Sequence, residues 1–333
     1  MKLPSLSSLP RQLAGCRRST CWWRTLVSTL SVALGGSALI SAENTPSTKV
    51  PVAERMGSVW SISDGDNTIY LAGSVHLLRE EDYPVSPVYD QVYDDSESIV
   101  MEVDLGEMLN PEGILKVQRL GMFGPDDSLD RHLSAELIDR LKAYLQTHPT
   151  GQLMALGLPK MKPGMILLSI SSLEAMRMNA RPELGLETTI YQKAMGDGKT
   201  VSGLETVEFQ MTCFDELSDK EIEKLLGETL DEVDEMSAKI DKLIAAWHRG
   251  EEGKLDTLMN EEMEEGKVRE LLLTERNANW IPHIEKAIKG SRNVMFLVGA
   301  AHLVGKDSVV DLLRKKGYQV EKVVPKAALK KAA

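Results

Sequence analysis

Short apolar stretches near both ends of the chain have the pattern of β-strands. Residues 59–63 alternate between apolar and polar side chains, the turn-forming sequence 64–67 follows, and residues 68–72 are again largely apolar, which predicts a hairpin. Further strands are predicted at residues 98–104, 200–202, 293–298 and 319–324. The predicted strands therefore gather mainly in two regions that lie far apart along the chain.

The segment between about residues 106 and 290 has mainly helical periodicity. Residues 133–145 carry apolar side chains at helical spacing, and Pro163 fits the first turn of a helix. A capping box at Ser218 begins an amphipathic run that extends to residue 244. This pattern predicts a long helical insertion between the two strand-rich regions.

One motif occurs twice, at corresponding places in the two strand-rich regions. Residues 69–77 (IYLAGSVHL) and residues 295–303 (MFLVGAAHL) each read as an apolar strand, a glycine, two small or apolar residues and His-Leu. A helix-like stretch and a further strand follow each copy. We therefore predict an α/β fold with a mixed sheet built from two strand–GxxH–helix–strand units. Because these units lie near opposite ends, the chain is expected to close into one domain over residues 57–325.

The histidines of the two motifs, His76 and His302, are the first candidates for a functional site. A residue just beyond a strand lies at the carboxyl edge of the sheet, where open α/β sheets bind their ligands. Two such units in one sheet can bring both imidazoles together, and imidazoles serve as metal ligands and as general bases. One GxxH alone is usually a structural feature, and the repetition makes a shared site the better hypothesis.

Glu102 is the third candidate, because it lies inside an apolar predicted strand. Its neighbours Met101 and Val103 are expected to face the opposite side of the sheet from Glu102. A buried carboxylate is costly unless it is paired or holds a cation. His76, His302 and Glu102 match the ligands of an open catalytic site that holds Zn, Mn, Fe or Co and leaves one position for water.

The N-terminal segment differs from the rest of the chain. Residues 1–42 contain basic but no acidic residues, and their apolar stretch 26–42 ends in small or apolar positions. This composition predicts a cleaved signal peptide, with a permanent membrane anchor as the alternative. Residues 43–56 are expected to be a linker and residues 326–333 a basic tail. The protein is thus predicted to be exported, periplasmic or secreted, with membrane contact only through its N-terminal segment.

Charge and cysteine content exclude several classes of protein. The 333 residues include 39 basic and 50 acidic side chains, a net charge of -11, which argues against binding of nucleic acid by general electrostatics. The three cysteines cannot build a disulfide framework or a four-cysteine zinc site. Cys16 and Cys21 lie in the predicted signal, so Cys213 would remain alone as a small buried apolar residue.

Several short motifs in their order along the chain resemble the TraB/GumN family, which includes the Tiki-type metalloproteases. The resemblance covers roughly residues 57–325. It rests on the sequences LAGSVHL at 71–77, MEVD at 101–104, GLE at 185–187, GLET at 203–206 with Gln210, RN at 276–277 and VGAAHLVG at 298–305. It implies a mixed α/β fold with a helical insertion and two GxxH motifs that face one cleft. For the Tiki branch it implies metal-dependent hydrolysis of peptide bonds.

The resemblance also implies roles for individual residues. His76, Glu102 and His302 match the family's metal or acid–base positions, Glu205 a base or substrate contact, and Arg276 a stabiliser of an oxyanion. Many members have Asp where this chain has Glu187, so the reach of that longer side chain is open. Two structural interpretations stay open as well. Glu205 can cap the helix that carries Phe209 and Gln210, and Arg276 can pair with Glu270 or Glu275.

Together these features predict an exported metal-dependent hydrolase, expected to be a peptidase, that acts on a peptide or small molecule. A divalent cation held by His76, Glu102 and His302 would activate a water molecule. One alternative is a hydrolase without metal, in which His76 is a general base supported by Glu102. Another is a protein that sequesters peptides without chemistry. The chain has no G-x-S-x-G elbow near a histidine, no phosphate-binding loop and no dinucleotide fingerprint.

Overall fold

The computed structural model describes residues 49–261 and 266–326. The predicted signal peptide or anchor (1–42), the first part of the predicted linker and nearly all of the predicted basic tail lie outside these residues. Within them, no helix is long and apolar enough to cross a membrane.

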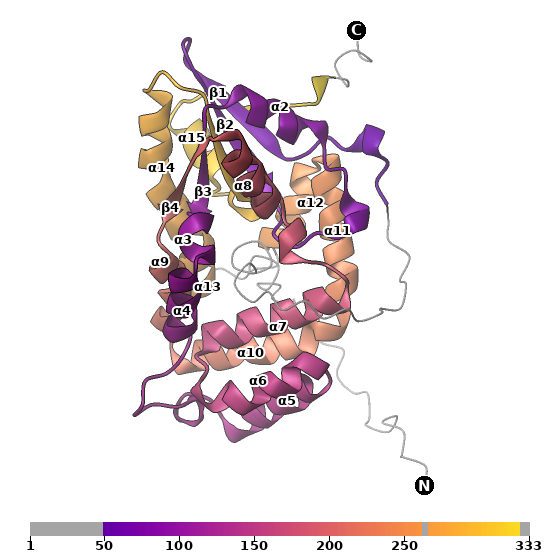
Figure 1. Cartoon of the computed structure of the whole chain (residues 1–333), viewed down its shortest axis with the longest axis vertical. Helices are drawn as coiled ribbons and strands as arrows, with labels where there is room; N and C mark the ends of the chain where they lie inside the picture. The colour runs from indigo at the N-terminus through magenta and orange to yellow at the C-terminus, as the bar shows by residue number, and fades with distance from the viewer. Residues whose placement is uncertain (1–48, 262–265, 327–333) are drawn as a thin grey trace.

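A six-stranded sheet forms the framework of the domain (Figure 1). Its strands are β1 (Val59–Ser63), β2 (Thr68–Ser74), β3 (Ser98–Val103), β4 (Thr200–Glu205), β5 (Val294–Gly299) and β6 (Glu321–Lys322), in the order β4-β3-β5-β2-β1-β6. Strands β2, β5, β3 and β4 run parallel, while β1 lies antiparallel to both β2 and β6. The mixed α/β class and the hairpin of β1 and β2 are confirmed.

The two GxxH motifs follow neighbouring parallel strands. In the register of β2 and β5, Gly73 lies opposite Val298 and Ser74 opposite Gly299. Both motifs therefore leave the sheet at the same edge. Strand β5 is buried along its whole length, as its continuous apolar sequence requires. Strand β6 is much shorter than its predicted range of 319–324, because it pairs only with Trp60 and Ser61 of β1.

Helices connect and cover the strands. They are α2 (Pro87–Asp95), α3 (Leu105–Leu109), α4 (Pro111–Leu120), α5 (Ala135–Gln146), α6 (Pro149–Gly157), α7 (Pro163–Arg177), α8 (Leu186–Asp197), α9 (Val207–Thr212), α10 (Asp219–Glu232), α11 (Met236–Arg249), α12 (Glu252–Asp256), α13 (Lys267–Arg269), α14 (Glu275–Ile288) and α15 (Val309–Lys315). In Figure 1, α5, α6, α7 and α10 lie together at the end of the molecule away from β1. Strand β4 returns the chain to the sheet, so the helical insertion consists of two parts.

Local sequence signals explain how several helices begin. Pro163 occupies the first turn of α7, and Ser218 forms a capping box with Glu221 at the start of α10, as predicted. The run from 218 to 244 is not one helix, because a 3-10 turn at Val233–Glu235 separates α10 from α11. Acidic residues are concentrated there, and their charges oppose the dipole at the end of a helix but favour the start of the next one.

The start of α8 packs closely against the first GxxH motif. Leu186 donates its backbone N–H to the carbonyl of Val75, and a Cβ added to Gly185 would lie 2.2 Å from the carbonyl oxygen of His76. Only glycine permits this approach of two backbones. Gly185 therefore fixes the distance between α8 and the loop that carries His76.

We expect Gly185→Ala to lower the free energy of unfolding by about 1–3 kcal/mol, because the new methyl group must displace the His76 backbone. Gly196→Ala, in the last turn of the same helix, is the matched control. A Cβ at Gly196 meets no atom within 4 Å, so this change should be neutral or stabilise the protein by up to about 1 kcal/mol. Urea unfolding of both variants measures the difference, and equal midpoints would contradict the packing described.

Candidate active site

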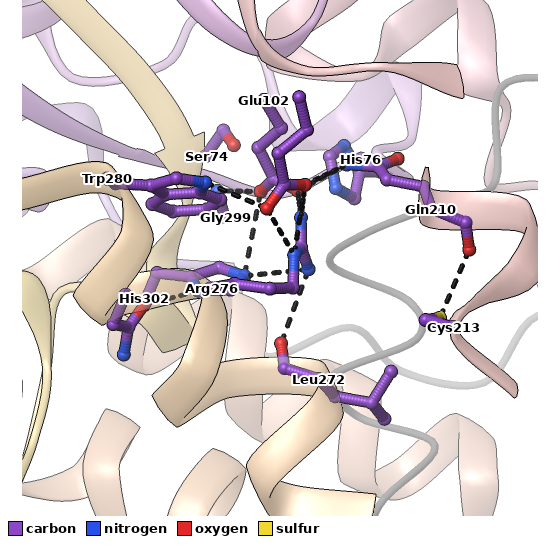
Figure 2. Close-up of polar contacts among 12 residues, drawn as sticks. Ser74, His76, Glu102, Gln210, Cys213, Leu272, Arg276, Trp280, Gly299 and His302 are labelled. Atoms are coloured by element: carbon purple, nitrogen blue, oxygen red, sulfur yellow. Dashed lines mark hydrogen bonds and ion pairs between the residues drawn. The ribbon is translucent and has the colours of Figure 1, made fainter. Parts of the chain in front are cut away.

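Side chains from five segments of the chain meet at the carboxyl edge of the sheet. Glu102 comes from β3, Glu205 from the end of β4 and Arg276 from α14. His76 follows β2, while His302 ends a 3-10 turn after β5. Figure 2 shows Arg276 beside Glu102, Trp280 and His302. The structure therefore brings the predicted residues of β3, β4, β5 and α14 into one buried cluster.

Arg276 forms the centre of this cluster. Its Nε and Nη2 groups donate to the Glu205 carboxylate at 3.0 and 2.8 Å, and Nη2 also donates to Glu102 at 2.6 Å. Nη1 donates to the carbonyl of Leu272 and lies 3.2 Å from Nε2 of His302. Burial lowers the pKa of Arg276, but the two carboxylates outweigh this effect and raise it. The guanidinium thus remains charged and uses all five of its N–H groups.

Glu102 is buried and fully engaged. One oxygen accepts the backbone N–H of Gly299 at 2.7 Å, and the other accepts from Arg276 and, at 3.2 Å, from Gln210. Burial raises the pKa of Glu102, and the nearby positive charge of Arg276 opposes that rise. The buried acid predicted from the strand pattern is therefore compensated by a guanidinium.

His302 has a defined tautomer. Its Nδ1 lies 2.7 Å from Oδ1 of Asn277, whose amide nitrogen donates to the carbonyl of Asp307 at 2.9 Å. Nδ1 therefore carries the proton, and the lone pair of Nε2 accepts from Arg276. Burial lowers the pKa of His302 far below its usual range, and the charges of Arg276 and His76 lower it further. His302 is consequently a neutral imidazole.

His76 has a different environment from His302. Its Nδ1 lies 2.6 Å from Oε1 of Glu187, an oxygen that also accepts the hydroxyl of Ser74. Nε2 of His76 is buried and has no hydrogen-bond partner among residues 49–261 and 266–326. Burial lowers the pKa of His76, but the charge and contact of Glu187 outweigh this and raise it. The longer side chain of Glu187 thus reaches the site, a point that the sequence left open.

Both structural alternatives from the sequence are settled by these contacts. The cap of α9 is Thr206, whose hydroxyl accepts the N–H of Phe209, while Glu205 accepts from Arg276 and from Trp280 at 2.8 Å. The ion pairs of Arg276 are with Glu102 and Glu205, which lie far from it in sequence. Sequence reasoning missed Trp280 as a partner of the site, because an aromatic residue at a helical core position carries no signal of such a contact.

Arg276 also decides whether a shared cation fits. Oε2 of Glu102 and Nε2 of His302 both face N–H groups of its guanidinium, and Oε1 of Glu102 accepts the backbone N–H of Gly299. Within the described part of the chain, no three His, Cys, Asp or Glu side chains are grouped as metal ligands. A cation held by His76, Glu102 and His302 does not fit this arrangement while Arg276 is in place. The predicted ligand set stays a prediction.

Known proteins provide an independent comparison. The chain is 24% identical to the metalloprotease TIKI2 of Danio rerio, over 93% of this chain and 69% of that protein. It is 25% identical to a metalloprotease TIKI homolog of Amphimedon queenslandica, over 49% of this chain and 37% of the relative. The uncharacterized protein YbaP of Escherichia coli is 22% identical, over 75% of this chain and 89% of that protein. No solved structure matches the chain.

The profile of the TraB/PrgY/gumN family matches residues 58–322. This range includes both GxxH motifs and every residue of the buried cluster. Membership of a family does not by itself assign a reaction. The match nevertheless confirms the resemblance found in the motifs, and the chain belongs to the TraB/PrgY/gumN family.

Proposed function

We propose that this protein hydrolyses peptide bonds and that His76 is its general base. The observation that carries the proposal is the state of the His76 ring. Nδ1 lies 2.6 Å from the buried carboxylate of Glu187 in an ion-pair contact, while Nε2 is buried and has no polar contact within the described residues. A general base needs this combination of an oriented ring and a free lone pair. The names of two relatives, both metalloproteases, support peptide-bond hydrolysis as the reaction.

Glu187 orients and polarises His76 in this proposal. When Nδ1, beside Glu187, carries the proton, Nε2 can take a proton from a water molecule that attacks a carbonyl carbon. The carboxylate then stabilises the imidazolium that forms, and the ring can return the proton to the leaving amine. Ser74 restrains Glu187 through the shared oxygen. The sequence had suggested Glu102 as the support for His76, and Glu187 now has that place in the proposal.

Arg276 is assigned a positioning role. Its five N–H groups are all engaged, so the guanidinium has no donor left for an oxyanion in this arrangement. It joins the ends of β3 and β4 to α14 through Glu102 and Glu205. It also directs the lone pair of His302, which lies in the second GxxH motif.

Metal-dependent hydrolysis is the second candidate, because two of the relatives are named as metalloproteases. Export is proposed with either candidate, on the basis of the basic and apolar N-terminal sequence. Sequestration of a peptide without cleavage remains the non-catalytic alternative. The following experiments distinguish these possibilities.

His76→Gln should lower the rate of peptide hydrolysis about 100-fold or more, because loss of a general base typically has this effect. Digestion of a mixed peptide library, followed by mass spectrometry, measures the rate. His283→Gln is the matched control, because His283 is exposed on α14. If both variants cleave like the parent protein, His76 is not the base. If the parent protein instead retains intact peptide in equimolar amounts, it is a binding protein.

Glu187→Gln should shift the pH dependence of the reaction. Glu187 raises the pKa of His76, and a general base works only when deprotonated, so activity should fall as the pH drops through a pKa above 6.5. Without the carboxylate, burial alone lowers that pKa, and the acidic limb should move to lower pH. The pH profile of kcat/KM measures the shift. Glu183→Gln, an exposed acid next to α8, should leave the profile unchanged.

Metal analysis of the purified protein separates the two hydrolytic candidates. A mechanism based on His76 and Glu187 predicts that a chelator leaves peptide hydrolysis unchanged. A metal-dependent mechanism predicts a stoichiometric metal and loss of activity with a chelator, restored by Zn, Mn or Co. Elemental analysis and the peptide-library assay, before and after chelation, give the result.

A further inference from the structure

One guanidinium bridges two side chains that have the chemistry of metal ligands. Nη2 of Arg276 lies 2.6 Å from Oε2 of Glu102, and Nη1 lies 3.2 Å from Nε2 of His302. Oε1 of Glu102 and Nε2 of His302 are themselves 3.9 Å apart. Two ligands of one tetrahedral cation, with bonds of about 2.0–2.1 Å, lie about 3.3 Å apart. The two side chains are thus nearly spaced for one cation, with Oε1 of Glu102 also accepting the backbone N–H of Gly299 and Oε2 facing the guanidinium.

The hydrogen bonds around His302 orient its ring so that Nε2 can bind a cation. Asn277 holds the proton on Nδ1, which leaves the lone pair of Nε2 directed at the guanidinium. Histidine ligands of metals commonly donate their other N–H to a fixed acceptor in this way. The acceptor is itself fixed, because the amide of Asn277 donates to the carbonyl of Asp307. His302 therefore offers a preoriented lone pair to whichever cation lies beside it.

Because both are positively charged, the guanidinium and a divalent cation cannot occupy this cluster together. Glu102 and Glu205 are both buried against Arg276, which contributes one positive charge to two carboxylates. A divalent cation in the same place would neutralise both carboxylates. A cation added while the guanidinium stays would meet a positive charge at close range in a buried site, where such repulsion is strong.

We propose that Arg276 takes the place of a metal ion in this cluster and that a divalent cation binds Glu102 and His302 only when the guanidinium leaves. Arg276 thus lowers the affinity of the protein for a divalent cation. This inference does not rest on the proposed hydrolysis, because cation binding is measured directly. It also explains physically why the predicted metal ligands Glu102 and His302 contact a guanidinium.

Titration of the purified full chain with Co²⁺ tests the proposal, since the visible absorption of Co²⁺ reports its coordination. We expect Arg276→Ala to bind one Co²⁺ at least about tenfold more tightly than the parent protein. Adding Glu102→Gln to this variant should remove the gain. Circular dichroism establishes that each variant is folded, and Co²⁺ should raise the Tm of Arg276→Ala more than that of the parent protein.

Arg276→Lys covers the case in which the alanine variant does not fold. Lysine keeps the positive charge, but its three donors lie on one nitrogen and cannot replace the five N–H groups with which the guanidinium contacts Glu102, Glu205, Leu272 and His302. Its Co²⁺ affinity should therefore lie above that of the parent protein. The proposal is overturned if a folded variant at position 276 binds Co²⁺ no more tightly than the parent. It is also overturned if the gain persists after Glu102→Gln.

Free guanidinium tests the mutual exclusion itself. In Arg276→Ala, guanidinium chloride far below denaturing concentrations should fill the vacated space and weaken the apparent affinity for Co²⁺. Sodium chloride at the same concentration is the control for ionic strength. Equal effects of the two salts would show that the guanidinium group and the metal ion do not compete for one place.

Discussion

The buried charge of Arg276 is the constraint on which the site depends. An uncompensated guanidinium inside a protein costs several kcal/mol, and removal of one partner from a buried ion pair is strongly destabilising. Acceptors from β3, β4, the segment before α14 and the turn after β5 compensate the charge of Arg276. Elements distant in sequence must therefore dock together before the arginine is satisfied. The cluster ties the sheet to the helical insertion as well as shaping its chemistry.

The sheet order provides the second condition. Because β2 and β5 are neighbours, the start and the end of the domain share one edge. Because β3 pairs with β5 and with β4, Glu102 and Glu205 come from adjacent parallel strands. The histidines and the acids thus take their positions from backbone pairing, while the helices supply the groups that contact them.

The strands and the sheet edge could be predicted from the sequence, whereas the partners of the buried side chains could not. Alternating polarity, turn residues and the repeated GxxH motif identified the hairpin, the buried strands and the edge at which the candidate residues gather. These signals are local, so they survive without knowledge of the fold. Glu102 could be selected because a single acid in an apolar strand requires compensation. Its partner could not be selected, because the two residues are 174 positions apart.

Arg276 illustrates the same limit. In sequence, Glu270 and Glu275 are the nearest acidic residues and so its obvious partners. The fold instead gives it Glu205, 71 positions away, and Glu102. The length of Glu187 raised a question about reach that only the placement of α8 answers. Partner identity is a tertiary property, whereas strand pattern and capping are local ones.

The repeated motif has a consequence for how this fold can diversify. Its two copies look interchangeable in sequence, yet the first histidine contacts a carboxylate from α8 and the second an amide and a guanidinium from α14. Environments that push two such groups toward opposite protonation states create distinct acid and base roles. The duplicated strands only locate the rings. Changes confined to one helix can therefore alter one histidine while the other, and the sheet that holds both, stay as they are.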